Sequence, residues 1–171
     1  MGSLDWGLLI VRVVAGLIFA AHGAQKAFGW WSGPGLPGWQ AAMERMALRP
    51  ARLWALLSAG TELLAGLALA IGFLTPVASA LLAGQSLVII GQVHLPKGLW
   101  NKDGGVEFPL TLAAIVAAIV VTGPGAASID AGLRLDVAPV ARLALLLIGV
   151  LGGATALLLP RVHGRTPLRA G

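Results

Sequence analysis

Five apolar stretches, separated by polar or glycine-rich connections, constrain this 171-residue chain more than any other feature. They cover residues 6–28, 53–74, 77–95, 108–122 and 140–159. A helix needs about 20 apolar residues to cross a bilayer, with a range of about 17–25. Four of the stretches reach this length, and the stretch at 108–122 is short. Because helices satisfy their own backbone groups in lipid, the sequence predicts an all-α transmembrane bundle.

The composition excludes two large classes of protein. Hydrophobic residues make up 57% of the chain and charged residues only 11%, whereas a soluble domain carries about 25% charged residues. So few charges cannot cover a surface that faces water, which excludes a soluble globular enzyme. A chain this apolar is not disordered either. The 24 glycines suit helices that approach one another closely in lipid.

The absence of cysteine and the distribution of charge exclude further functions. With no cysteine, the chain has no thiol redox chemistry, disulfide framework, iron–sulfur cluster or covalently attached c-type haem of its own. The formal net charge is +5. The basic residues lie between and after the apolar stretches, however, as topology signals do, so we do not expect nucleic-acid binding.

Lysine and arginine predict the orientation of the chain in the membrane. If all five stretches cross, one side of the membrane holds the connections after the first and third stretches and the C-terminal tail. These segments carry Lys26, Arg45, Arg49, Arg52, Lys97, Lys102, Arg161, Arg165 and Arg169. The opposite side carries only Arg134 and Arg142. The positive-inside rule therefore predicts a multi-pass protein of the cytoplasmic membrane, with the N-terminus outside and the C-terminus in the cytoplasm.

The connection between the first two stretches contains a predicted short helix. A Gly33-Pro34-Gly35 turn precedes it, and Pro37 is suited to the first helical turn. The segment 37–48 is amphipathic, with Trp39 on its apolar side, which is typical of a helix lying at the membrane interface. An ordinary ordered loop is the alternative.

Gly149 and Gly153 stand four residues apart in the last stretch. This spacing creates a surface of small residues on one helix face, which allows close helix packing. The surface could serve inside the bundle or against a second copy of the chain in a homo-oligomer.

Ionisable and polar side chains inside the apolar stretches carry the functional signal. A charged residue at the centre of a spanning helix costs about 2.5–3.5 kcal/mol even on a mild insertion scale, so it should face the bundle interior and have a partner. At about 100° per residue, Arg12, His22 and Lys26 share one face of the first helix within an arc of about 80°. The other candidates on the next three stretches are Glu62, Gln85, Gln92, His94 and Glu107.

Depths estimated at about 1.5 Å per residue place these residues along one line. Counted from the predicted cytoplasmic edge, Lys26 lies at the surface, Glu62 about 15 Å deep and Arg12 about 24 Å deep, from where Arg12 could reach toward Glu62. We therefore expect a polar column lining a pocket for a polar head group with an apolar tail. A buried Arg12–Glu62 ion pair that only fixes helix register, a snorkelling pair of His22 and Lys26, and a loop histidine at His94 are the simpler alternatives.

Two other chemistries would use the same residues. His22 and His94 could ligate a b-type haem, but their estimated depths differ by about 7 Å. A metal could be bound by His22, Glu62, His94 and Glu107, but no short-spaced ligand pair supports this. We therefore expect neither haem nor metal.

Several motifs resemble the DoxX family of small bacterial and archaeal membrane proteins. The first helix contains a segment similar to the family's HGxxKxxG signature. In chain order the matching residues are Arg12, His22-Gly23-Ala24-Gln25-Lys26-Ala27-Phe28-Gly29, Glu62, Gly66, Gly72-Phe73-Leu74-Thr75-Pro76, His94, Glu107-Phe108-Pro109-Leu110, Gly123-Pro124-Gly125 and Ser128-Ile129-Asp130. The resemblance covers about residues 6–131.

The resemblance implies a four-helix membrane module over residues 1–135. The chain departs from the family pattern over 136–171, where an additional helix and a basic tail go beyond this module. It also implies a link to thiosulfate:quinone oxidoreductase, whose membrane subunit belongs to a related group. The expected ligand is then a quinone, as part of a quinone-linked oxidoreductase system in a prokaryotic membrane. His22 and Glu62 would move protons, and the ligand would contact Arg12, Lys26, Gln85, Gln92, His94 and Glu107.

Two functions of other classes remain as alternatives. The basic loops and tail suit a non-catalytic scaffold that recruits soluble redox enzymes to the membrane. A small-solute carrier is the other alternative, although the sequence has no inverted repeat or pair of broken helices of the kind that carriers use.

Overall fold

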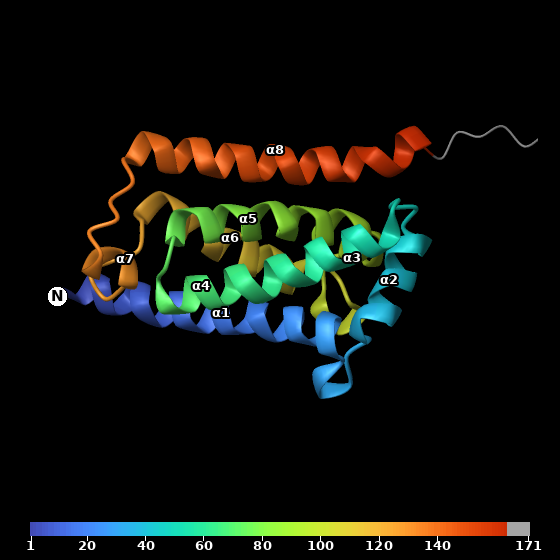
Figure 1. Ribbon diagram of the computed structural model, residues 1–171, viewed down its shortest axis with the longest axis horizontal. Coiled ribbons are helices and arrows are strands. Elements are labelled where there is room, and N and C mark those ends of the chain that lie inside the picture. The colour runs from blue at the N-terminus through green and yellow to red at the C-terminus, as the bar shows by residue number, and fades with distance from the viewer. Residues whose placement is uncertain (164–171) are drawn as a thin grey trace, which may run out of the picture.

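The computed structural model describes the backbone of residues 1–163 and the side chains of residues 1–158. This part of the chain is helical and contains no strand. Long helical segments run side by side along the molecule (Figure 1). They are α1 (Ser3–Phe28), α3 (Ala51–Gly60) continuing through the π-helical segment η2 (Thr61–Ala65) into α4 (Gly66–Ile71), α5 (Thr75–Ile89) continuing into the π-helical segment η3 (Ile90–His94), α6 (Glu107–Thr122) and α8 (Pro139–His163).

The helix lengths confirm the prediction of a multi-pass, all-α membrane protein. Four segments are long and apolar enough to cross a bilayer, namely Ser3–Phe28, Ala51–Ile71, Thr75–Lys97 and Pro139–Leu158. The helix α6 is apolar but has only 16 residues, as expected from the short stretch at 108–122. The surface of the molecule is covered with exposed leucine, valine and isoleucine side chains, which suits contact with lipid.

Short helices cover the two ends of the bundle. The end that we call the α2 end carries η1 (Trp30–Ser32), α2 (Gly35–Arg45), η4 (Leu95–Lys97) and η5 (Asn101–Asp103). The opposite end carries the N-terminus, the turn between α4 and α5, and α7 (Ile129–Gly132) (Figure 1). The predicted helix over 37–48 therefore exists, but it ends at Arg45, because Ala47 adopts a left-handed conformation with φ of 58° as the chain turns toward α3.

Glycines let α1 lie directly against the helix formed by α3, η2 and α4. A Cβ atom built on Gly16 would lie 2.6 Å from the backbone oxygen of Gly66, and one built on Gly66 would lie 2.6 Å from the backbone nitrogen of Ala20. Real Cβ atoms essentially never come so close, so only glycine fits at these crossings. The backbone contact continues at Gly23, which lies against Leu63 in the π-helical segment.

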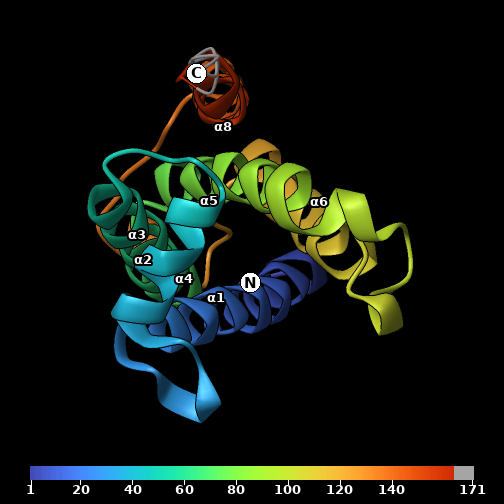
Figure 2. The same cartoon turned by 90° about the vertical axis from the view of Figure 1, so that its right-hand side faces the viewer.

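The last long helix, α8, lies on the outside of the bundle against α5 (Figure 2). Gly149 faces the carbonyl of Ala80, and Gly153 faces the carbonyl of Gly84, with no room for a Cβ atom at either glycine. This contact decides between the two uses expected of the Gly149 and Gly153 surface. It packs inside the chain against α5, so these glycines are not free for a second copy.

Candidate functional site

The centre of the candidate site is a buried ion pair between Lys26 and Glu62. The Lys26 Nζ atom lies 2.6 Å from both carboxylate oxygens of Glu62 and donates a hydrogen bond to Oε1. The Glu62 side chain is 1% exposed and that of Lys26 is 12% exposed. A buried charge needs such a partner, because leaving one of the two alone in a low-dielectric interior is costly.

Local backbone features bring these two side chains together. Glu62 lies in the π-helical segment η2, where one wide turn interrupts the helix between α3 and α4. Such π-bulges frequently occur at functional sites. Gly23 lies one turn before Lys26, and a Cβ atom there would overlap the backbone of Leu63. The glycine of the His22-Gly23 motif therefore lets α1 approach the π-helical segment closely enough for Lys26 to reach Glu62.

Trp39 on α2 covers the ion pair. The Lys26 Nζ atom lies 4.5 Å from the centroid of the Trp39 ring, in cation–π geometry. The indole nitrogen of Trp39 is buried and has no hydrogen-bond partner among the described residues. A buried indole N–H usually finds a partner, so this N–H is an unsatisfied donor beside the ion pair.

Trp39 also lines a cavity of about 430 Å³. The cavity lies between α2, α3, α5 and α8, and its volume falls within the range of about 300–1,000 Å³ typical of small-molecule sites. Most of its lining is apolar. Three of the lining residues, Leu57, Leu81 and Ile148, are at least half exposed on the outer surface, so the cavity borders the surface that faces lipid.

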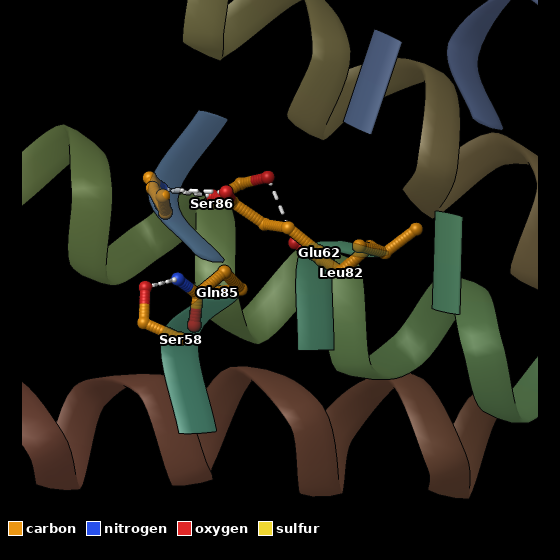
Figure 3. A network of polar contacts seen from close by, with 6 residues as sticks. Ser58, Glu62, Leu82, Gln85 and Ser86 are labelled. Atoms are coloured by element: carbon orange, nitrogen blue, oxygen red, sulfur yellow. Dashed lines mark hydrogen bonds and ion pairs between the residues drawn. The ribbon is translucent and has the colours of Figure 1, made fainter. Parts of the chain in front are cut away.

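The polar groups of the cavity come from α2, α3 and the α5–η3 helix. The Gln85 amide nitrogen donates a 2.7 Å hydrogen bond to the Ser58 hydroxyl (Figure 3), and both residues line the cavity together with Thr61, Gln92 and Trp39. The hydroxyl of Ser58 keeps its own proton for a further acceptor. The site therefore offers several hydrogen-bond donors in mostly apolar surroundings.

Arg12 does not pair with Glu62 as the sequence had suggested. Its side chain is 2% exposed, and its guanidinium donates hydrogen bonds to the backbone carbonyls of Pro124 and Ala127. The expected single polar column is thus wrong: Arg12 belongs to a second cluster at the N-terminal end of the bundle. Asp130 completes that cluster by accepting hydrogen bonds of 2.7 Å and 2.8 Å from the backbone nitrogens of Leu74 and Thr75.

The remaining predicted residues lie outside the cavity lining. His22 is exposed on α1, with its ring centroid 6.2 Å from that of Phe108 on α6. The His94 Nδ1 atom lies 2.7 Å from the carbonyl oxygen of Gly104. Glu107 accepts a 3.0 Å hydrogen bond from the backbone nitrogen of Asn101. The contacts of His94 and Glu107 hold the connection between η3 and α6 in place, which agrees with the interpretation of His94 as a loop histidine.

The structure thus divides the eight predicted residues into groups. Lys26 and Glu62 form the ion pair, and Gln85 and Gln92 line the neighbouring cavity. The other four, Arg12, His22, His94 and Glu107, contact other parts of the chain. Among the side chains that the structure describes, no three histidine, aspartate or glutamate residues lie together in a way that could hold a metal ion.

The fold and this site define a helical multi-pass membrane protein with an apolar cavity beside a buried ion pair. The sequence profile of the DoxX family matches residues 7–95, just over half of the chain. The chain therefore belongs to the DoxX family, as its motifs predicted. The match includes Lys26, Glu62, Gln85 and the rest of the cavity lining from α2, α3, α5 and η3, whereas α6 and α8 lie beyond it.

No curated protein and no solved structure is significantly similar to this chain.

Proposed function

We propose that this protein is the membrane component of a quinone-linked oxidoreductase system and binds a quinone-like ligand in the cavity between α2, α3, α5 and α8. The observation that supports the proposal is a mostly apolar cavity lined by Trp39, whose buried indole N–H has no partner among the described residues. An amphipathic ligand with hydrogen-bond acceptors on a flat head group would satisfy this donor and fill the apolar space.

The polar groups suit the two carbonyl oxygens of a quinone. Trp39 can donate to one carbonyl, and the amides of Gln85 and Gln92 or the hydroxyl of Ser58 can donate to the other. When bound, a quinone supplies the capacity to accept two electrons and two protons. In this proposal the electrons come from a partner oxidoreductase subunit or its substrate.

The ion pair would act on the ligand from behind Trp39. Neither Lys26 nor Glu62 lines the cavity, so both are positioning residues in this proposal. Lys26 holds the Trp39 ring through its cation–π contact, and Glu62 holds Lys26. Glu62 can also exchange a proton with Lys26 across their short hydrogen bond. His22 lies outside the lining, so we assign it no contact with the ligand.

The ligand would enter from the bilayer rather than from water. The exposed side chains of Leu57, Leu81 and Ile148 form part of the lining, so an apolar molecule dissolved in lipid can reach the cavity laterally. We further propose that the α2 end faces the cytoplasm, because the connections with Arg45, Arg49, Lys97 and Lys102 lie at this end. The predicted basic tail residues Arg165 and Arg169 lie outside the described residues.

The proposal is tested by measuring quinone binding to the purified protein in lipid nanodiscs. We expect decylubiquinone to raise the thermal unfolding temperature of the wild type in a concentration-dependent way, because a ligand that binds only the folded state stabilises it. Gln85→Leu removes one head-group donor and should weaken binding about tenfold, the size expected for losing a hydrogen bond of about 1.4 kcal/mol.

Gln40→Leu is the matched control, because Gln40 lies on α2 outside the cavity lining and makes only a 3.4 Å contact to Glu44. It should bind decylubiquinone like the wild type. A wild-type protein that neither retains extractable quinone nor is stabilised by added quinone would overturn the proposal.

A further inference from the structure

One long wall of the cavity comes from α8, which lies beyond the part of the chain matched by the family profile. The residues of α8 that line the cavity are Leu145, Ile148, Gly149, Gly152, Gly153 and Ala156. Their spacing of three and four residues places them on one face of the helix. Within this face, Gly149 and Gly153 touch α5, so α8 stands close to α5 while the neighbouring positions border the open space.

Gly152 differs from the other two glycines on this face. A Cβ atom built on Gly152 would meet no atom of the described residues within 4 Å, whereas Cβ atoms on Gly149 and Gly153 would collide with α5. Glycine in the middle of a helix costs about 1 kcal/mol relative to alanine. Helix packing accounts for Gly149 and Gly153, but it does not account for Gly152. Gly152 is exposed and also lines the cavity, so glycine at this position leaves free space where the cavity borders the outer surface of the bundle.

The height of Gly152 along the cavity is given by the neighbouring contacts. Gly153 faces the carbonyl of Gly84, and Gly84 in turn faces the carbonyl of Gly149, so Gly152 lies near the level of Gln85, the head-group donor. From Gln85 the cavity continues toward the start of α5, where Val77, Ala80, Leu81 and Leu145 line it. The eight steps from Val77 to Gln85 correspond to about 12 Å of mostly apolar wall at about 1.5 Å per residue.

We infer that α8 makes this cavity a site for a ligand with a linear apolar tail: Gly152 leaves room for the flat head group opposite Gln85, and the tail lies between α5 and α8 toward Val77 and Leu145. The inference rests on the proposed function and adds the class of ligand, a quinone that carries an isoprenoid or alkyl chain. The tail direction follows from the lining, because Trp39 on α2 and Gln92 on η3 lie on the α2 side of Gln85, whereas Val77, Ala80 and Leu81 on the other side of Gln85 are apolar.

The test compares a tailed quinone, decylubiquinone, with the same head group lacking the tail, ubiquinone-0. Binding is measured by thermal stabilisation in nanodiscs, with ligand concentration expressed per lipid and protein-free nanodiscs correcting for partition. We expect the wild type to bind decylubiquinone more tightly than ubiquinone-0. Gly152→Leu fills the space opposite Gln85 and should weaken both ligands at least about tenfold, the lower end of what one misplaced aliphatic group costs in an apolar pocket.

Leu145→Trp narrows only the apolar part of the cavity and should remove the preference for decylubiquinone while leaving ubiquinone-0 binding unchanged. The unchanged binding of ubiquinone-0 also shows that this variant is folded. Gly7→Leu is the matched control for Gly152→Leu, because Gly7 is another helical glycine with nothing within 4 Å and it lies outside the cavity. It should bind both ligands like the wild type.

Each outcome separates the inference from the proposal beneath it. Equal binding of the two ligands by the wild type, or normal binding by Gly152→Leu, would overturn the inference about α8 and leave the proposed quinone site standing. Failure of the wild type to bind either ligand would overturn the proposed function itself.

Discussion

The helix α1 carries one largely buried cation in each half, and the two cations have different partners. Arg12, in the N-terminal half, is bound by backbone carbonyls of the 124–127 segment. Lys26, about 21 Å further along the helix at 1.5 Å per residue, is bound by another ionisable side chain and by the Trp39 ring. Each cluster contains a buried carboxylate, but that of Asp130 is held by backbone N–H groups, whereas that of Glu62 pairs directly with the cation of Lys26.

The surroundings of Arg12 and Lys26 differ as well. At the Arg12 end the polar groups bind backbone atoms and fasten loops, as Asp130 does at the start of α5. At the Lys26 end the π-helical segment η2 widens the helix formed by α3 and α4, and a cavity lies next to the ion pair. The indole N–H of Trp39 has no partner there within the described part of the chain. In our proposal the first cluster serves stability and the second serves ligand binding.

The largest expected effect comes from breaking the ion pair. Lys26→Met or Glu62→Leu alone should lower the free energy of unfolding by about 3–5 kcal/mol, because either change leaves an uncompensated buried charge. The double variant should recover most of this loss, since a pair of apolar side chains leaves no charge behind. Reversible unfolding in mixed micelles measures all three, and a double variant as unstable as the sum of the singles would contradict the direct coupling of Lys26 and Glu62.

A smaller effect is expected at the other end of α1. Arg12→Met removes the donors to the carbonyls of Pro124 and Ala127, and each unpaired buried carbonyl costs about 1–3 kcal/mol. Stability in the same unfolding assay should fall accordingly, while the affinity for decylubiquinone of the protein that remains folded should stay unchanged. A selective loss of quinone affinity in this variant would place Arg12 in the ligand site and remove the distinction between the two ends.

The smallest effect on stability is expected at Trp39. Trp39→Phe keeps an aromatic ring for Lys26 but removes the N–H that has no partner among the described residues, together with part of the packing against Met43 and Leu48, so the free energy of unfolding should fall by only about 1 kcal/mol. Quinone affinity should nevertheless fall about tenfold if that N–H donates to the ligand. Calorimetric titration in nanodiscs measures the affinity, and an unchanged affinity would show that the donor does not reach the head group.

The spanning helices could be predicted from the sequence because length and hydropathy alone determine which segments suit the bilayer. The short helix after Gly33-Pro34-Gly35 could be predicted as well, since Pro37 and the amphipathic pattern are local signals. Its C-terminal boundary could not, because the left-handed conformation of Ala47 depends on how the chain returns to α3.

The pairing of Lys26 with Glu62 could not be derived by counting residues from a membrane edge. That count assumes that all helices start in one plane, and it put about 15 Å between two residues whose charged atoms lie 2.6 Å apart. The helices meet instead where Gly23 touches Leu63, and the long lysine side chain covers the remaining distance. The placement of glycines opposite a charged residue was the usable signal, and it also explains why Arg12 lies too far along α1 to reach Glu62.

The contribution of Trp39, Ser58 and α8 to the cavity could not be predicted from single positions. Trp39 was interpreted as an interfacial residue, and the glycines of α8 as a packing surface. Gly149 and Gly153 do pack, but whether a third glycine faces protein or open space depends on the rotation of α8 against α5, which only the three-dimensional contacts determine.

The most direct test of the account is to find which residues a bound quinone touches. The purified protein would be labelled in nanodiscs with a photoreactive azidoquinone, with decylubiquinone as competitor, and the labelled peptides identified by mass spectrometry. We predict competed labels on α2 around Trp39 and on the α5–η3 helix between Gln85 and Gln92. Competed labels confined to α6 or to the Arg12 end of α1, with none at the cavity, would contradict the account.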